Sequence, residues 1–129
     1  MSNTTASPAK ILIVDDEPNI IIAIEFLLQR AGFEVFTAFS GIQALELANE
    51  CLPQLVILDV MMPGLNGFEV AAQLRQNPVF ENLKIVFLTA KGTEADKETG
   101  YAKGAEYYLV KPFDNDHLVS TVQEIISYG

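Results

Sequence analysis

Three carboxylates, one hydroxyl and one amine each follow a short apolar run of the sequence. Runs of this kind indicate strands that are buried on both faces, as in a parallel sheet. Because the carboxyl ends of parallel strands lie at one edge, where such proteins bind their ligands, we expect the five side chains to meet there. They are Asp15 and Asp16 after residues 11–14, Asp59 after 55–58, Thr89 after 85–88 and Lys111 after 107–110.

Three carboxylates in one pocket need a cation or an unusual protonation state, because a pair roughly 4 Å apart repels by about 4 kcal/mol at an effective dielectric of about 20. No His or Cys is among the five residues, so Mg²⁺ is favoured over zinc, and Mn²⁺ is expected to substitute. With the charge neutralised, Asp59 can attack phosphorus. Asp15 and Asp16 would hold the ion, while Thr89 and Lys111 would bind phosphoryl oxygens.

Each of the five residues also has an ordinary structural interpretation. An aspartate after a strand commonly caps a turn or a helix, and Asp16, two residues before Pro18, suits that role. A threonine or a lysine alone at such a position indicates almost nothing. Turn chemistry rarely places all five at the ends of four strands, so the group as a whole predicts a functional site.

Helical patterns fill the segments between the apolar runs, so strands and helices alternate five times. The strand 34–38 is more mixed in composition and is typical of an edge. Right-handed crossovers favour a flavodoxin-like (βα)5 doubly wound fold, with a five-stranded parallel sheet in the order 2-1-3-4-5 and helices on both faces. The expected helices are 18–32, one from the capping box Ser40–Gln43, one from Gly67 to before Pro78, 93–103, and one after Asp114.

The composition fits one domain over residues 10–129. A chain of 129 residues, 50% of them hydrophobic, can bury roughly two-thirds of its unfolded surface. Residues 1–9 have neither charged side chains nor an apolar core, so they are predicted to be a disordered tail rather than a targeting signal. The single Cys51 excludes an intramolecular disulfide and is interpreted as a small buried hydrophobe.

Charge and hydropathy exclude two classes of partner. Seventeen acids against eight bases give a net charge of −9, which argues against direct contact with nucleic acid. The longest apolar stretches, such as 20–24, are far shorter than the roughly 20 residues that a membrane helix needs. The sequence therefore predicts a soluble, cytoplasmic protein without membrane insertion.

Four motifs resemble the receiver domain of bacterial two-component response regulators, in its single-domain form. The resemblance covers nearly the whole chain, from Lys10 to about Tyr128. It implies a phosphorylation-dependent signalling switch of a phosphorelay rather than a metabolic enzyme, although a receiver catalyses its own phosphorylation and a slow autodephosphorylation. The motifs are Val14-Asp15-Asp16-Glu17, Leu58-Asp59-Val60-Met61-Met62-Pro63-Gly64 with Gly67, Leu88-Thr89-Ala90, and Val110-Lys111-Pro112-Phe113.

The resemblance also implies the role of each acidic residue. Asp59 would accept a phosphoryl group from a histidine kinase or a histidine phosphotransfer protein. Mg²⁺ would be held by Asp16, Asp59 and the backbone carbonyl of Met61. Asp15 would act through a metal-bound water.

Two further features are implied at the ends of the last strands. Thr89 would move toward the phosphoryl group and Tyr108 would turn inward with it; from the sequence alone, a strand tyrosine more often packs in the core. The Lys111–Pro112 peptide bond would be cis. Only about 5–6% of X-Pro bonds in folded proteins are cis, so this expectation comes from the resemblance alone.

Two surfaces are candidates for partner contact. Ile22 and Phe26 fall roughly opposite the core-facing side of the first helix, and we hypothesise that they contact the helical bundle of the phosphodonor; the alternative is scattered surface hydrophobes. The resemblance assigns a downstream protein target to the face made by the helix 93–103, the strand 107–110 and the last helix. Gly100 weakens the first of these, and the alternative is an ordinary surface helix.

Two other functions compete with the switch. A phosphatase of the haloacid dehalogenase type needs a second aspartate two residues after the nucleophile, where this chain has Met61. A receiver that signals without phosphorylation would have an eroded acidic pocket, and this pocket is intact by residue type. We expect either a stand-alone receiver or an excised module, because no output domain follows Gly129, and either a monomer or a dimer that forms on phosphorylation.

Overall fold

The computed structural model describes residues 8–90 and 105–128. Strands and helices alternate from residue 10 to residue 89, and the last described strand is followed by the last helix, as the sequence predicts. The predicted helix 93–103 and residues 1–7 of the predicted tail lie outside the described residues. The elements are β1 Lys10–Val14, α1 Pro18–Arg30, β2 Glu34–Ala38, α2 Gly41–Cys51, β3 Leu55–Asp59, α3 Gly67–Arg75, the 3-10 helix η2 Pro78–Phe80, β4 Lys84–Thr89, β5 Tyr107–Val110 and α5 Asn115–Tyr128.

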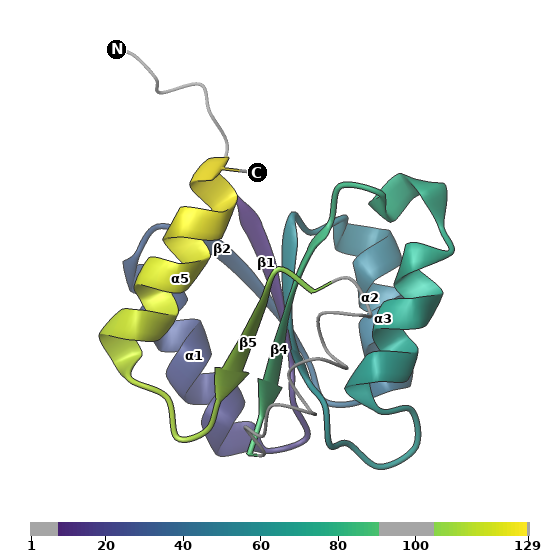
Figure 1. Ribbon diagram of the computed structural model, residues 1–129, viewed down its shortest axis with the longest axis horizontal. Helices are drawn as coiled ribbons and strands as arrows, with labels where there is room; N and C mark the ends of the chain where they lie inside the picture. The colour runs from purple at the N-terminus through teal and green to yellow at the C-terminus, as the bar shows by residue number, and fades with distance from the viewer. Residues whose placement is uncertain (1–7, 91–104, 129) are drawn as a thin grey trace.

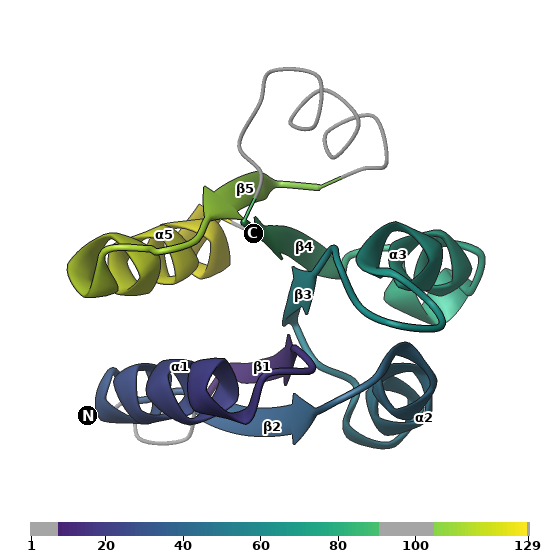
Figure 2. The ribbon, with the colours of Figure 1, turned by 90° about the horizontal axis from the view of Figure 1, so that it is seen from below.

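The five strands form one parallel sheet in the order β2-β1-β3-β4-β5, which confirms the predicted topology. Helices α1 and α5 cover one face of the sheet, and α2 and α3 cover the other (Figures 1 and 2). This is the flavodoxin-like arrangement. It puts the carboxyl ends of all five strands at one edge, which is at the bottom of Figure 1.

Alternate residues of each strand supply the two cores on either side of the sheet. In β1, Leu12 and Val14 belong to the core beneath α2 and α3, whereas Ile11 and Ile13 belong to the core beneath α1 and α5. All four side chains are fully buried. Strands β1, β3 and β4 are continuously apolar inside because both of their faces are covered, so their polar side chains are confined to the strand ends. The edge strand β2 is more mixed and has Thr37 inside it.

Several element boundaries differ from the prediction. Helix α1 ends at Arg30 rather than residue 32, because Gly32 adopts a φ of 96° and the chain turns back there, with the Phe33 N–H donating to the Leu28 carbonyl at 3.1 Å. Asp59 is the last residue of β3, at the carboxyl end of the strand as predicted. The short helix η2 was not predicted. Within the described residues, no helix combines the length and the apolar character needed to cross a membrane.

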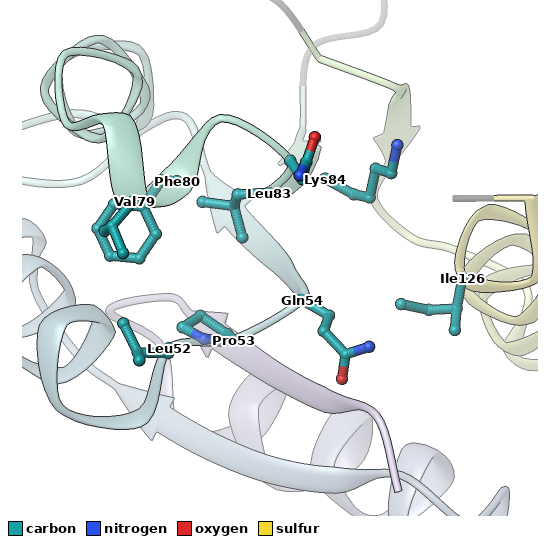
Figure 3. A pocket seen from close by; sticks show the side chains of 9 residues that line it. Leu52, Pro53, Gln54, Val79, Phe80, Leu83, Lys84 and Ile126 are labelled. Carbon is teal, nitrogen blue, oxygen red and sulfur yellow. The ribbon is translucent and has the colours of Figure 1, made fainter. Parts of the chain in front are cut away.

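The amino-terminal edge of the sheet, opposite the carboxyl ends, is closed by hydrogen bonds beside an apolar pocket. The Arg75 guanidinium donates to the carbonyls of Leu83 at 2.8 Å and Phe80 at 3.3 Å, and lies 3.7 Å from the Glu106 carboxylate. Figure 3 shows the pocket, of about 270 Å³, with side chains of α5 on one flank and of η2 on the other. Its lining is Leu52, Pro53, Gln54, Val79, Phe80, Asn82, Leu83, Lys84 and Ile126.

Candidate functional site

The carboxyl edge of the sheet, which faces the viewer in Figure 2, brings together the residues that the sequence singled out. Asp59 ends β3, Asp15 directly follows β1, and β1 and β3 are hydrogen-bonded neighbours. Lys111 directly follows β5, and its backbone N–H donates to the Thr89 carbonyl at 2.7 Å, which ties the end of β5 to β4. The topology therefore places all of these side chains at one edge.

The Lys111 ammonium lies among three carboxylates. Its nitrogen is 2.9 Å from Asp15 Oδ2, 3.0 Å from Glu17 Oε1 and 3.7 Å from Asp59 Oδ1. Asp15 and Asp59 are buried, whereas the Glu17 side chain is 61% exposed at the mouth of the site. One cation therefore faces more negative charge than it can balance.

This charge imbalance appears in the pKa values. Burial, reinforced by the charge of Asp15, raises the pKa of Asp59 from 3.8 to about 7, although Lys111 and a hydrogen bond with the Met61 backbone act in the opposite direction. Burial by itself would lower the pKa of Lys111, but its contacts with Asp15 and Glu17 and the charge of Asp59 raise it above its ordinary value. Without a bound metal ion, ionisation of Asp59 is therefore unfavourable.

The donor set of the site fits a hard divalent cation. Carboxylate oxygens of Asp15, Asp16 and Glu17 lie within 4.8 Å of one another. Oδ2 of Asp15 is buried and has no hydrogen-bond partner of good geometry among the residues that the structure describes, although the Lys111 ammonium lies 2.9 Å from it. Neither His nor Cys is among these residues. A metal that prefers oxygen ligands would satisfy this atom and offset the repulsion among the acids.

The turn between β3 and α3 fixes the backbone of Asp59. A Cβ on Gly67 would collide with the carbonyl oxygen of Asp59, so this position has room only for glycine. Asn66 and Glu69 form a capping box at the start of α3, with hydrogen bonds of 2.9 and 2.8 Å, and so anchor the far end of the turn. Met61 lies on the same turn with its side chain exposed at the surface.

The two predicted switch residues, Thr89 and Tyr108, are both buried. Thr89 is the last residue of β4, at the same edge as Asp59. The Tyr108 ring packs edge-on against Phe87, with 6.3 Å between the ring centroids, so it faces the core in this structure. The Lys111–Pro112 peptide bond is cis, the geometry that the resemblance implied. The movement of Thr89 and Tyr108 stays a prediction.

Helix α1 exposes the pair of apolar side chains that its sequence pattern indicated. Ile22 is 63% exposed and Phe26 is 58% exposed, while the opposite side of the helix is buried. The Arg30 guanidinium lies 5.5 Å from the centre of the Phe26 ring, within the range of a cation–π contact. The surface is therefore apolar with a basic neighbour, and its contact with a phosphodonor stays a prediction.

Glu17 is the residue of the site that the sequence analysis did not assign. The Glu17 N–H donates to Asp15 Oδ1 at 2.9 Å, so the chain turns sharply after β1 and the Glu17 carboxylate comes beside Lys111. Asp16, like Glu17, is exposed. The sequence signal that could have identified Glu17 was its position directly after Asp15 and Asp16 and directly before Pro18, the first residue of α1.

Comparison with known proteins agrees with this geometry. The family model described as the response regulator receiver domain matches residues 11–123. PilH of Pseudomonas aeruginosa is 35% identical over 119 residues, which cover 92% of this chain and 98% of PilH. The phosphate regulon transcriptional regulatory protein PhoB of Rhizobium meliloti is 41% identical over 117 residues, 91% of this chain and 52% of PhoB. The chain thus spans about half the length of PhoB and of several other curated relatives.

Solved structures match the chain over a similar extent. The chemotaxis protein CheY4 of Vibrio cholerae has a TM-score of 0.87 and 37% identity, covering 92% of this chain and 98% of that one. A putative response regulator from Chloroflexus aurantiacus has a TM-score of 0.88 and 39% identity, covering 93% and 98%. The fold, the strand-end residues and these relatives lead to one conclusion: the chain belongs to the response regulator receiver domain family.

Proposed function

We propose that this chain is a phosphorylation-dependent switch of two-component signalling in which Asp59 is the phosphoacceptor. Membership of the receiver family supports the switch. The observation that carries the role of Asp59 is its placement: it is buried at the end of the central strand, with its carboxylate 3.7 Å from the Lys111 ammonium and next to Asp15.

In the proposed reaction, a carboxylate oxygen of Asp59 attacks the phosphorus of a phosphohistidine carried by a kinase or a phosphotransfer protein. The new O–P bond forms as the N–P bond breaks, and the leaving imidazole takes up a proton from solvent. Asp59 must be ionised to attack, and its raised pKa opposes ionisation. Lys111 stabilises the charged form of Asp59 and would then pair with a phosphoryl oxygen.

The acidic residues of the site would hold Mg²⁺, for which Mn²⁺ would substitute. Asp16, Asp59 and the backbone carbonyl of Met61 are the proposed ligands, with Asp15 next to them. When bound, the ion supplies positive charge that offsets both the carboxylates and the transferring phosphoryl group. Thr89 would donate its hydroxyl to a phosphoryl oxygen that neither Lys111 nor the ion occupies.

The proposed partners are a phosphodonor at α1 and a downstream protein at the face made by β5 and α5, in the cytoplasm. Ile22 and Phe26 supply an exposed apolar surface for the first. Tyr108 links the site to the second, because it lies on β5, next to β4, which ends in Thr89. The rest of the predicted output face falls on residues 93–103, outside the described part of the chain.

The first experiment measures the intact mass of the protein after incubation with acetyl phosphate, with and without Mg²⁺. We expect the wild type to gain one phosphoryl group only with the metal and Asp59→Asn to gain none. Asp114→Asn is the matched control, since it makes the same change at an exposed acid after β5. Phosphorylation of Asp59→Asn to the wild-type extent would refute the assignment.

The donor surface has a separate test. Ile22→Ser combined with Phe26→Ser should slow transfer from a cognate histidine kinase or phosphotransfer protein, because the apolar contact is lost. The same variant should react with acetyl phosphate at the wild-type rate, since neither side chain touches Asp59. Unchanged transfer from the protein donor would show that this surface is not the docking site.

A further inference from the structure

We propose that Glu17 is a positioning residue that holds Lys111 while Asp59 is unphosphorylated and so slows phosphoryl transfer. The inference rests on the proposed function, because it takes Lys111 as the residue that binds the phosphoryl group. The inference adds a residue that influences the rate at which Asp59 is phosphorylated. Glu17 would act through Lys111 and not on the reacting atoms themselves.

The first support is the number of partners around Lys111. A lysine ammonium has three N–H donors. Three carboxylates surround it, with oxygens at 2.9, 3.0 and 3.7 Å, belonging to Asp15, Glu17 and Asp59. A phosphoryl oxygen must therefore compete with these carboxylates for Lys111, and Glu17 is the one of the three that accepts a hydrogen bond of good geometry from the ammonium.

Burial decides which carboxylate gives way. Asp15 is completely buried, so turning it away from Lys111 would leave a charged oxygen without compensation. Asp59 is the residue that bonds to phosphorus and must stay in place. The Glu17 side chain is 61% exposed and can turn into water at little cost. Of the three, Glu17 is thus the partner that can be exchanged for a phosphoryl oxygen.

The local backbone argues against a simple capping role for Glu17. It occupies the N-cap position of α1, with φ −97° and ψ 111°, yet its side chain makes no capping hydrogen bond. Capping side chains are normally short, and Ser, Thr, Asp and Asn lead at this position. The carboxylate of Glu17 instead lies 3.0 Å from the Lys111 ammonium, which is 94 residues away in the sequence. Its contact belongs to the site and not to the helix.

The negative charge of Glu17 should slow phosphorylation, as its contact with Lys111 does. Glu17 adds a negative charge to a site that already holds Asp15, Asp16 and Asp59, and phosphodonors are anionic. Weakening either the contact or the charge should therefore speed the reaction. An exposed ion pair of this kind corresponds to a factor of roughly two to five in rate.

Two substitutions separate the contact from the charge. Glu17→Asp keeps the charge but shortens the side chain by one methylene, so it loses reach to Lys111, whereas Glu17→Gln keeps the length and removes the charge. The measurement is the rate of phosphorylation by acetyl phosphate below saturation, with Mg²⁺ saturating for each variant. We expect both variants to react roughly two- to fivefold faster than the wild type. Glu46→Gln, an exposed acid on α2, should leave the rate unchanged.

A second readout needs no phosphorylation. In the metal-free protein, the ¹⁵Nζ NMR signal of Lys111, assigned with Lys111→Met, should move in both Glu17 variants and stay fixed in Glu46→Gln. Unchanged signals, or Glu17 variants that react at or below the wild-type rate, would overturn the inference. If the wild type takes up a phosphoryl group while the variants match it, the inference alone fails. If the wild type takes up none, the proposed function fails with it.

Discussion

The two edges of this sheet differ in how their charges are matched. At the amino-terminal edge, Arg75 pairs with Glu106 and with backbone carbonyls, and Glu106 also accepts the Ile85 N–H at 2.7 Å. At the carboxyl edge, Lys111 faces three carboxylates and the pKa of Asp59 is raised to about 7. The difference indicates that one edge contributes stability, while the other gives up stability to hold a reactive group.

The apolar pocket and the cluster of titratable side chains lie at opposite edges of the sheet. The pocket in Figure 3 lies at the amino-terminal edge, and Lys84 is the one charged residue among those that line it. The carboxyl edge is where the acids and Lys111 converge. The titratable groups, and not this pocket, therefore mark the edge where the chemistry is expected.

The largest expected effect comes from removing the charge of Asp59. Its folded pKa of about 7 lies above the ordinary value of 3.8, so the folded state binds the proton more tightly than the unfolded state does. Stability of the metal-free protein should therefore fall as pH rises from about 4 to about 7. Asp59→Asn should remove this fall and raise the unfolding free energy at pH 8 by about 2–4 kcal/mol.

Urea titrations of the wild type and Asp59→Asn at pH 4 and pH 8, in the presence of EDTA, check this prediction. The two proteins should be similar at pH 4, where Asp59 is protonated, and the gain at pH 8 should shrink in saturating Mg²⁺. A lower stability of Asp59→Asn at pH 8 without metal would mean that Lys111 outweighs burial at this carboxylate.

The next largest effect on stability is expected in the turn between β3 and α3, at the carboxyl edge of the sheet. Gly67→Ala should destabilise the protein by about 2–3 kcal/mol, because the new methyl group overlaps the Asp59 carbonyl and the turn must move. Gly64→Ala in the same turn meets no neighbour within 4 Å and only strains a residue with φ 76°, so it should cost about 1 kcal/mol. Chemical unfolding of both variants gives the comparison, and equal losses would show that the close approach at Gly67 relaxes easily.

The sequence predicted the sheet order and the meeting of Asp15, Asp59, Thr89 and Lys111 because these depend on backbone topology. Each of these residues ends or directly follows a strand, so parallel pairing fixes its place whatever its side chain does. The exposure of Ile22 and Phe26 was predictable for a similar reason, since a helix repeats every 3.6 residues.

The contact of Glu17 with Lys111 was not predictable in this way. It depends on the sharp turn after β1, where Asp15 accepts the Glu17 N–H, and on the rotamer of a long, exposed side chain. The sequence pattern also did not predict the left-handed backbone conformation of Leu52, because glycine or asparagine usually occupies such a position after a helix. Features set by single side-chain conformations leave little trace in periodicity or spacing.

A smaller effect on stability is expected when the amino-terminal edge, where the charges are paired, loses Arg75. Arg75→Met keeps most of the apolar stem but removes the donors to the carbonyls of Leu83 and Phe80 and the partner of Glu106. The loss should be about 1–2 kcal/mol, because the carbonyls and the carboxylate are left with fewer partners. Thermal or urea unfolding measures it, with Lys84→Met, a lining residue of the neighbouring pocket, as the control. No loss would mean that water replaces the guanidinium at this edge.

The smallest effect also arises at the amino-terminal edge, at Leu52, the residue that follows α2. Its backbone is in the left-handed region with a φ of 50°, and its side chain is 52% exposed. Leucine in this conformation costs about 1 kcal/mol, and asparagine tolerates it better. Leu52→Asn should therefore stabilise the protein by about 0.5 kcal/mol despite some lost apolar contact. Leu52→Ala loses the same contact without relieving the backbone, so it should destabilise. Opposite signs in urea unfolding would place the strain in the backbone, whereas a loss in both variants would show that the pocket wall needs the leucine side chain.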